Sequence, residues 1–277
     1  MGELSILKVD PDKCTKCGLC SEVCPPGIIA QSEKGPEMTL SERCIACGHC
    51  VAICPTAALD NEKNPLANQV PLDKFPVIDA DTAYKFLRSR RSVRCYKKEP
   101  VAHETILQLL DIARFAETAG NSQGLSYQVI DDPDTLKKII KVTVDYLDEC
   151  YKAGYPWAQR YGRYVDMYRE TGKDTILRGA PTLILALADE NLRTGWDNAR
   201  TALAYVELYA AAMGLGTVWG GYVELCGSAK YQPFLELINL PAGKKVCGAL
   251  MVGYPKYTYK RLVDRNTLQV TWGRGEE

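Results

Sequence analysis

Eight of the twelve cysteines lie between residues 14 and 54 and form two copies of one pattern. Each copy has the spacing C-x2-C-x2-C-x3-C followed by proline, and the second starts 30 residues after the first. This offset indicates an internal duplication. Two-residue gaps allow three thiolates on one tight loop to face a single cluster, while the fourth cysteine follows one helical turn later. The spacing therefore predicts two [4Fe-4S] clusters with these ligands: Cys14, Cys17, Cys20, Cys24, Cys44, Cys47, Cys50 and Cys54.

Zinc sites and disulfides are the alternative uses of these cysteines. Zinc motifs usually pair two C-x2-C knuckles over a longer gap, which two complete four-cysteine runs do not match. A disulfide framework in a secreted protein would distribute its cysteines over the whole length. The remaining four are scattered (Cys95, Cys150, Cys226 and Cys247), and we expect Cys226 and Cys247, which lie in apolar stretches, to be core residues.

Residues 4–60 resemble bacterial two-cluster ferredoxins, in which the fourth cysteine of each run ligates the opposite cluster. The resemblance implies one cluster on Cys14, Cys17, Cys20 and Cys54, and the other on Cys44, Cys47, Cys50 and Cys24. Gly18 and Gly48 are expected to keep side chains away from the clusters. We expect His49 to be a solvent-facing loop residue rather than a ligand, with a hydrogen bond to the second cluster as the alternative.

Charge and hydropathy limit the partners and the cellular compartment that we expect for the protein. Lys+Arg and Asp+Glu both number 34, so bulk charge does not favour nucleic acid as a partner. We find no run of eighteen apolar residues and no charged-then-apolar leader, so neither a membrane span nor a signal peptide is expected. Clustered thiolates favour a reducing compartment, and we expect a cytoplasmic protein.

The pattern changes after the second cysteine run. Residues 59–81 contain three prolines and little periodicity, which predicts a semi-rigid connector. We therefore expect a two-cluster domain at 1–62, a linker at 63–79 and a second domain at 80–277. Helical and strand patterns mix there without regular βαβ alternation, which predicts an α+β fold.

Apolar spacing locates the elements of the second domain. Helices are expected at 81–92, 103–120, 134–151 and 198–214, and strands at 126–132, 180–189, 216–222 and 246–255. Asp79 or Asp81 is expected to cap the first helix, and Gly120 to end the second.

The stretch "RSRRSVRCY" at 88–96 concentrates four arginines and two serines. A solvated basic face at a helix end is one interpretation. The other is a phosphate grip, because guanidinium groups pair bidentately with phosphate oxygens and serine adds a hydroxyl. Spacing alone leaves both open.

Five segments in order resemble the nitroreductase family of FMN enzymes, and together they cover about residues 80–275. They are "RRSVRCYKKEPV", "ARFAETAGNSQ", "RGAPTLILALAD", "ALAYVELYAAAMGLGTVWGGY" and "MVGYPKYTYKRLVDR". The resemblance implies FMN as cofactor and a central, mostly antiparallel sheet flanked by helices. It also implies a homodimer with the flavin at the subunit interface.

The resemblance also assigns roles to individual residues. The FMN phosphate and ribityl chain would be held by Arg90, Arg91, Ser92 and Arg94. The flavin bound mainly to the partner subunit would be reached by Thr118, Ala119, Gly120 and Asn121. The isoalloxazine would lie along Val218, Trp219, Gly220 and Gly221, where a backbone amide contacts N5. The phosphate site would be completed by Lys260, Arg261 and Arg265.

The chain departs from the family pattern at several of these positions. Glu117 and Thr118 replace the usual Pro and Ser, Gly124 follows Gln123 where Pro is usual, and Gly220 replaces a frequent Glu. These changes bear on substrate specificity rather than on FMN binding.

An aromatic segment follows at 145–174 and has two interpretations. It is either an amphipathic helix pair with aromatic packing or a lid over the open face of the flavin. Four cations of this segment would then favour an anionic or nitro-bearing substrate: Lys152, Arg160, Arg163 and Arg169. With His49 and a surface His103 as its two histidines, the chain is not expected to hold a histidine-based triad.

The sequence thus predicts an FMN-dependent oxidoreductase that passes electrons from two [4Fe-4S] clusters to FMN and on to a small organic acceptor such as a nitroaromatic or quinone. The donor would be a ferredoxin-like carrier or NAD(P)H, although no Gly-x-Gly-x-x-Gly marks a separate dinucleotide domain. No side-chain general acid is assigned. The alternatives are a dedicated electron-transfer protein that docks to a partner complex, and a reductive dehalogenase or flavin reductase.

Overall fold

The structure is a computed structural model that describes residues 6–273. By its internal contacts the chain separates into two units. The first extends to Val77 and also contains Thr118–Gln123, while the second contains Ile78–Glu117 and the chain from Gly124 onward.

The first unit consists of two small antiparallel sheets and short helices. β1 (Leu7–Val9) pairs with β4 (Leu59–Asn61), and β2 (Ile29–Ser32) pairs with β3 (Gly35–Met38). The helical pieces are α1 (Leu19–Glu22), η1 (Ser41–Arg43), α2 (His49–Ala52) and η2 (Leu66–Asn68). Leu7, Ile28, Ile29, Val51 and Leu59 form its apolar core together with the buried Cys20 and Cys50.

The duplication in the sequence recurs in the backbone. Left-handed φ angles occur at Lys16 and Ala46, at Gly18 and Gly48, and at Gly27 and Ala57, and each pair is separated by the repeat offset. Gly18 (φ 82°) and Gly48 (φ 73°) are the N-caps of α1 and α2. Glycine adopts this conformation without the steric cost that a Cβ would add, so the backbone favours glycine at both positions.

The second unit is built on a four-stranded antiparallel sheet in the order β5-β6-β8-β7. Its strands are β5 (Leu125–Ile130), β6 (Thr182–Asp189), β7 (Gly216–Trp219) and β8 (Lys244–Gly253). The expected α+β fold with an antiparallel sheet is confirmed. β6 is buried from Thr182 to Ala188, as its continuous apolar run predicts.

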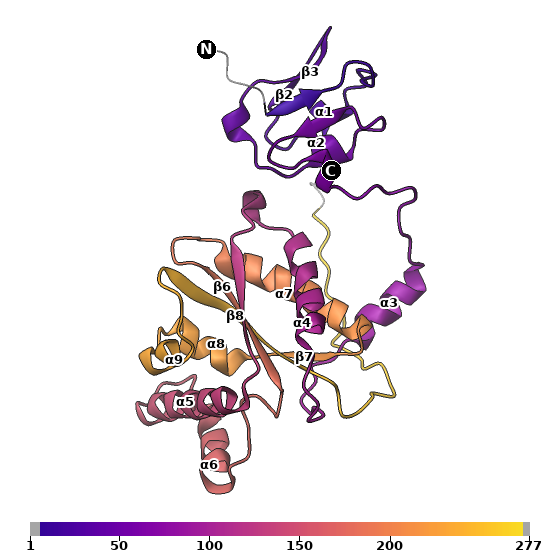
Figure 1. Ribbon diagram of the computed structural model, residues 1–277. Helices are drawn as coiled ribbons and strands as arrows, with labels where there is room; N and C mark the ends of the chain where they lie inside the picture. Colours follow the sequence, from indigo (N-terminus) through magenta and orange to yellow (C-terminus); the bar gives the residue numbers. More distant parts are fainter. Residues whose placement is uncertain (1–5, 274–277) are drawn as a thin grey trace. The chain divides into compact units, whose positions relative to one another are not determined.

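Helices cover both faces of this sheet, because alternate residues of β6 point to opposite sides (Figure 1). Leu183, Leu185 and Leu187 pack with α5 (Pro133–Lys152), α8 (Gly221–Ser228) and α9 (Gln232–Leu237). Ile184, Ala186 and Ala188 pack on the other side with α4 (His103–Asp111) and α7 (Gly195–Ala212).

The helix boundaries test the sequence-based expectations. Asp79 caps α3 (Ala80–Ser89), since its carboxylate accepts from the Thr82 amide at 3.0 Å, as predicted. The expected helix at 103–120 is too long. It ends as α4 at Asp111, continues as the 3-10 turn η3 (Ile112–Phe115), and becomes extended at Ala116. Gly120 instead lies with a left-handed φ in a separate turn, η4 (Ala119–Asn121).

The aromatic segment forms a helix pair. α5 is followed by the turn η5 (Gln159–Tyr161) and by α6 (Gly162–Thr171). Tyr146, Tyr161 and Tyr168 pack against the apolar core from these elements. The helix-pair interpretation is therefore correct for much of the segment. No helix among residues 6–273 is long and apolar enough to cross a membrane.

Candidate functional site

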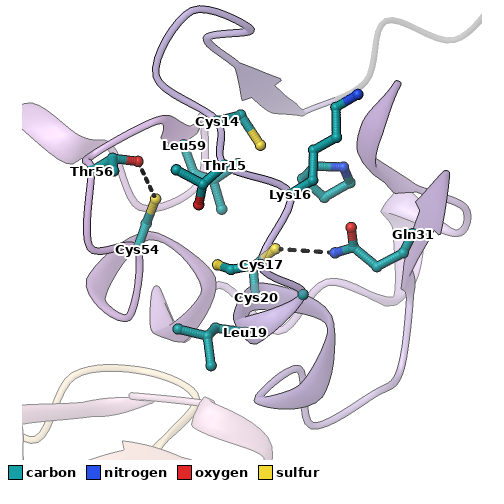
Figure 2. Close-up of a pocket in the computed structure, with 12 residues that line it drawn as sticks. Cys14, Thr15, Lys16, Cys17, Leu19, Cys20, Gln31, Cys54, Thr56 and Leu59 are labelled. Atoms are coloured by element: carbon teal, nitrogen blue, oxygen red, sulfur yellow. Dashed lines mark hydrogen bonds between the residues drawn. The ribbon is translucent and has the colours of Figure 1, made fainter. Parts of the chain in front are cut away.

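Four thiols of the first unit line one hollow. Cys14, Cys17 and Cys20 come from the first run and Cys54 from the end of the second, and Figure 2 shows their sulfur atoms arranged around it. The hollow encloses about 320 Å³ of atom-free space, open solvent included. The fold thus brings together the four residues that the sequence assigned to one cluster.

A second hollow has the reciprocal composition. Cys44, Cys47 and Cys50 line it together with Cys24, and it encloses about 310 Å³ of atom-free space. His49 also borders it but remains exposed. Cys24 follows the end of α1, and Cys54 follows the end of α2. Because of this position, each fourth cysteine lines the hollow formed by the first three cysteines of the other run. Ligation itself stays a prediction.

The arrangement of the thiols fits clusters better than single ions. Across the described range, no three Cys, His, Asp or Glu side chains converge tightly enough to hold one metal ion. A zinc site needs its sulfur ligands at about 2.3 Å from a single centre. Thiols spread around a hollow instead suit a multi-iron cluster, which fills the space between them.

Hydrogen-bond donors surround several of these sulfurs. The Ala58 amide donates to Cys54 Sγ at 3.2 Å, and Gln31 Nε2 donates to Cys20 Sγ at 3.6 Å. Burial raises the pKa of the Cys54 thiol, but amide hydrogen bonds from Ala58 and Thr56 outweigh it and lower the pKa overall. Such donors favour the thiolate form that iron requires.

Asn61, the last residue of β4, lines the second hollow. Its side chain is buried, and Nδ2 lies 3.9 Å from Cys44 Sγ and 4.0 Å from Cys50 Sγ. Its Oδ1 accepts from the Lys63 amide at 2.9 Å, which fixes the orientation of the side-chain amide. Asn61 therefore presents its N–H groups toward two thiols.

The loop predicted to reach the flavin belongs to the first unit. Asn121 Nδ2 donates to the carbonyl of Ile45, between two cysteines of the second run, at 2.8 Å. Thr118 Oγ1 accepts from the Gln123 amide at 3.0 Å and closes the turn. The roles of Thr118, Ala119, Gly120 and Asn121 toward a flavin stay predictions.

In the second unit, the arginine-rich stretch runs beside β7. Ser92 forms a bridge with Thr217, and the Val93 amide donates to the Thr217 carbonyl at 2.9 Å. A Cβ on Gly216 would lie 2.6 Å from the Val93 side chain, so glycine is required for this approach. Arg90 and Arg91 therefore lie just before the Ser92–Thr217 bridge, and Arg94 lies just after it.

Arg90 and Arg91 line a cavity of about 790 Å³ of atom-free space. Tyr257 and Tyr259, from the segment after β8, close its other side, and the Arg91 guanidinium lies 5.4 Å above the Tyr259 ring. Arg91 Nε is buried there and has no hydrogen-bond acceptor. A buried unsatisfied donor is costly, so this cavity fits an anionic oxygen such as a phosphate.

Glu207 of α7 also lines this cavity, and its carboxylate joins Arg90 to Trp219 of β7. Its buried carboxylate accepts from Arg90 Nη1 at 3.3 Å, from Thr217 Oγ1 at 3.2 Å and from Trp219 Nε1 at 2.8 Å. On its other side, the Trp219 ring lies 4.5 Å below the Arg200 guanidinium, and Arg200 pairs with Glu224 at 2.9 Å. Arg90 and Trp219 are therefore held in fixed orientations.

Arg94 and Trp219 belong to a neighbouring cavity of about 520 Å³ of atom-free space. Val218, Gly221 and Met251 form part of its wall, with Arg178 and Tyr222. Gly220 takes no part in this lining, and its amide donates to the Ala249 carbonyl at 2.8 Å. Three of the four residues predicted to lie along the isoalloxazine thus surround one cavity.

Other predicted site residues lie elsewhere. Lys260, Arg261 and Arg265 are exposed on the segment after β8, beyond the part that lines the cavity of Arg90 and Arg91. His103 is exposed and contacts Asp131 at 2.7 Å, and Cys226 and Cys247 are fully buried, as predicted for all three.

Two of the four cations proposed for substrate binding are already paired. Lys152 contacts Asp148 at 3.0 Å, and Arg169 contacts Asp145 at 2.6 Å. Arg160 stacks on Tyr161 at 4.9 Å, and Arg163 is exposed on α6. Arg178, which follows this segment and to which the sequence assigned no role, lines the cavity beside Trp219 together with Arg94.

The sequence also assigned no role to Asn61 or Glu207, although the charge of Glu207 stands out within an apolar helix. It is the one charged residue between Arg200 and the end of the Ala-rich helix, at a position that packs inward. Arg178 directly precedes the Gly-Ala-Pro segment but had no periodicity to mark it. Asn61 gave no signal beyond its position after the second run.

Comparison with known proteins matches each of the two parts of the chain to a protein family. Residues 87–254, more than half of the chain, match the family described as "Nitroreductase family". Residues 6–55 match the family described as "4Fe-4S dicluster domain".

Several characterised proteins are similar to the chain. It is 26% identical over 174 residues to an FMN reductase [NAD(P)H] of Bacillus subtilis, covering 62% of this chain and 65% of that protein. It is 24% identical over 172 residues to an iodotyrosine deiodinase of Thermotoga neapolitana, covering 62% of this chain and 88% of that protein. The chain thus spans less than two thirds of the Bacillus subtilis relative.

Solved structures share the fold. A nitroreductase with bound FMN from Bacteroides fragilis matches with a TM-score of 0.54 and 16% identity, over 68% of this chain and 98% of that one. An iodotyrosine deiodinase bound to FMN and 3-iodo-L-tyrosine matches with a TM-score of 0.54 and 23% identity, over 69% and 98%.

Proposed function

Because this chain belongs to the nitroreductase family and carries a 4Fe-4S dicluster domain, we propose that it takes up electrons through the clusters and delivers them at FMN to a small organic acceptor. It is an FMN-dependent oxidoreductase with two [4Fe-4S] clusters. When bound, the clusters supply one-electron transfer and FMN supplies two-electron chemistry. The observation that carries the proposal is the presence, in one chain, of two cysteine-lined hollows and a cavity with a buried, unsatisfied Arg91 donor.

The residues of the second unit would hold FMN by its phosphate and its ring. Arg91 and Arg90 would contact the phosphate oxygens, with Arg90 kept in place by Glu207. Val218 and Trp219 would lie along the ring, and Trp219 is fixed from both sides by Glu207 and Arg200. Pre-oriented groups lose little conformational entropy on binding, so this network favours a tightly held flavin.

A ferredoxin-like carrier is the donor that the fused clusters favour, because clusters accept single electrons. NAD(P)H is the alternative, since the Bacillus subtilis relative is an FMN reductase that uses it. Anaerobic titration with NADH, NADPH and reduced ferredoxin would separate the two, with cluster and FMN absorbance followed individually. We expect ferredoxin to bleach the clusters first. Bleaching of FMN by NADH with unchanged clusters would contradict this order.

Turnover tests the enzymatic part of the proposal. With reduced ferredoxin or dithionite as donor, the isolated protein should reduce nitroaromatics or quinones in the steady state. Absence of turnover with every soluble acceptor would instead favour a dedicated electron-transfer protein that docks to a partner complex.

Reductive dehalogenation and flavin reduction are second candidates, because the similar proteins include iodotyrosine deiodinases and an FMN reductase. A panel of halogenated phenols and free flavins, assayed with the same donor, distinguishes them. Release of halide would support the first, and reduction of added FMN the second.

We further propose a homodimer in the cytoplasm. α3 and α7 border an apolar groove of about 1080 Å³ of atom-free space, to which Phe86, Leu87 and Leu208 contribute. Leu87 is 55% exposed although it belongs to the apolar side of α3. A patch of this kind on a soluble protein suits a protein interface, and a second copy is the occupant that we propose. Reduced thiol ligands suit the cytoplasm.

A further inference from the structure

The two loops that carry the cysteine runs are repeats of one another but differ in exposure. Residues 15–17, the first loop, are all exposed. Residues 45–47, the second loop, occupy the equivalent positions of the second run and are all partly buried. Because the cysteine spacing is the same in both runs, the cover over the second loop must come from outside the repeat.

Two asparagine side chains provide this cover. Asn121 Nδ2 donates to the Ile45 carbonyl at 2.8 Å, and Asn64 Nδ2 donates to the Ala46 carbonyl at 3.4 Å. Gln123 Nε2 donates to Asn121 Oδ1 at 3.3 Å, which orients the Asn121 amide toward the loop. Within residues 6–273, no side chain donates to the two equivalent carbonyls of the first loop. The second loop is therefore held and the first is open.

The loop that carries Asn121 comes from the other part of the chain. Residues 118–123 belong to the first unit, but the residues before and after them belong to the second unit. Glu117, directly before this segment, accepts from the Tyr205 hydroxyl of α7 at 3.0 Å, and β5 begins at Leu125 shortly after it. Asn121 thus bonds the second loop to a segment that starts and ends in the unit with the arginine-lined cavity.

The first loop instead presents a cation to solvent. Lys16 borders the first hollow next to the exposed Cys17, and its side chain extends away from the thiols (Figure 2). Its ammonium group donates to the Glu33 carbonyl, and it forms no salt bridge with any carboxylate of residues 6–273. Lys8, exposed on β1, is by contrast paired with Glu62 at 3.1 Å. An unneutralised cation beside an exposed thiol favours an acidic protein partner.

We propose that the two cluster sites have different roles. An acidic one-electron carrier protein docks over Lys16 and gives its electrons to the first site, and the second site passes them toward the flavin. Asn121 is the positioning residue that holds the second loop for this transfer. The inference rests on the proposed function, because it gives that electron route a direction. Each carrier molecule loses one electron and leaves oxidised, and two such transfers supply the pair that FMN takes up with protons from water.

Single-turnover kinetics test the entry site. The holoprotein is mixed anaerobically, without acceptor, with a reduced plant-type [2Fe-2S] ferredoxin of net negative charge, and cluster and FMN absorbance are followed separately. Lys16→Gln should slow cluster reduction about threefold or more at low salt, and added salt should remove the difference, because salt screens charge-steered association. Lys8→Gln removes a cation that is already paired and should leave the rate unchanged.

Asn121→Gly should show the opposite pattern. Asn121 has a φ of 53°, so glycine retains the backbone conformation and removes only the side-chain amide. Cluster reduction should keep its native rate, whereas the subsequent reduction of FMN should slow about twofold or more, because transfer depends on how closely donor and acceptor are held. Asn239→Gly makes the same change at an exposed asparagine with a φ of 47° and should leave both rates unchanged.

Hydrogen exchange gives a readout that needs no electron transfer. In Asn121→Gly, amides of residues 44–48 should exchange about fivefold faster, as the loss of one hydrogen bond worth about 1 kcal/mol implies. Amides of residues 14–18, the equivalent positions of the first run, should exchange as in the native protein. Asn239→Gly should leave both segments unchanged. Iron and FMN contents confirm that each variant is loaded.

The entry site is overturned if the native clusters accept no electrons from the acidic ferredoxin, or if Lys16→Gln and Lys8→Gln react alike at low salt. The positioning role is overturned if Asn121→Gly reduces FMN as fast as Asn239→Gly, or if it loses cluster iron and so acts only on folding. Either result leaves the proposed function standing when native FMN is still reduced through the clusters. Native clusters that are reduced while FMN stays oxidised would remove the proposed function, and the Lys16 comparison would still decide the entry site.

Discussion

At the scale of single residues, the site depends on a buried carboxylate that serves three donors. Glu207 accepts from Arg90, Thr217 and Trp219, and a charged group at this depth is tolerated because its hydrogen bonds compensate for lost hydration. The network joins the arginine-rich stretch to β7. Its removal should therefore affect stability and FMN binding together.

Glu207→Leu leaves these donors without an acceptor, which costs about 1–3 kcal/mol for a buried group. We expect a lower denaturation midpoint and weaker FMN binding, measured by urea unfolding and by recovery of flavin fluorescence. Glu207→Gln retains an acceptor and should be intermediate. Glu236→Leu, on the exposed side of α9, is the matched control. An unchanged midpoint and FMN affinity in Glu207→Leu would refute the positioning role.

Asn61 provides a second prediction at this scale. Donors to cluster sulfurs stabilise the more negative, reduced state and so raise the reduction potential. Asn61→Leu removes the amide that lies near Cys44 and Cys50. We expect the potential of one cluster to fall while the other stays constant, as followed by EPR-monitored redox titration. Equal shifts of both clusters would contradict a local effect.

The role of a residue can be predicted from the sequence when its partners lie close to it along the chain. The cysteine spacing predicts which thiols gather, since each run is a single loop and the duplication relates the two. The position of Arg178 beside Val218 and Tyr222 was not predictable, because it depends on how β7 and α8 pack against the segment before β6. Those are tertiary contacts that no spacing rule encodes.

At the scale of elements, periodicity predicted β6 and α5 well because each buries a continuous face. Periodicity did not predict where α4 ends. Ile112, Ala113 and Ala116 continue the apolar spacing, but the backbone there is a 3-10 turn followed by an extended residue. An apolar side chain can be buried from either conformation, so the pattern did not mark where the α-helix ended.

The contact between α5 and α6 is expected to depend on pH through Asp145. Burial raises the pKa of the Asp145 carboxyl, but hydrogen bonds from Lys141 at 2.7 Å and Arg169 at 2.6 Å outweigh it and lower the pKa. A lowered native pKa contributes stability above the unfolded value near 3.9, and this contribution is lost as the pH falls through the native value.

Asp145→Asn should therefore reduce the free energy of unfolding at pH 7 by about 1 kcal/mol or less, because both cations are largely exposed. The difference from the native protein should shrink as the pH falls below about 4, where the native carboxyl becomes protonated. Urea titrations at several pH values measure it. Asp166→Asn, on the exposed side of α6, should show no comparable trend.

At the scale of the whole molecule, the sequence predicted two kinds of cofactor site but not the surface that α3 presents. α3 begins at a well-formed Asp79 cap, yet none of its residues is buried. Its apolar residues border the groove with α7, where Tyr205, Leu208 and Tyr209 are also partly exposed. An amphipathic helix with no buried residue has little packing to stabilise it, because packing rather than propensity supplies most helix stability, and the proposed second copy would provide that packing.

Leu87→Glu tests whether that partner is a second copy. A charge in this groove would be desolvated on association, so we expect the variant to sediment as a monomer at concentrations where the native protein is a dimer. FMN retention should fall with it if the flavin site is completed by the partner subunit. Lys85→Gln changes a residue of the same helix that pairs with Asp81 in solvent and should remain dimeric. A native protein that sediments as a monomer with FMN bound would exclude the homodimer, whereas a Leu87→Glu dimer would place its interface elsewhere than on α3.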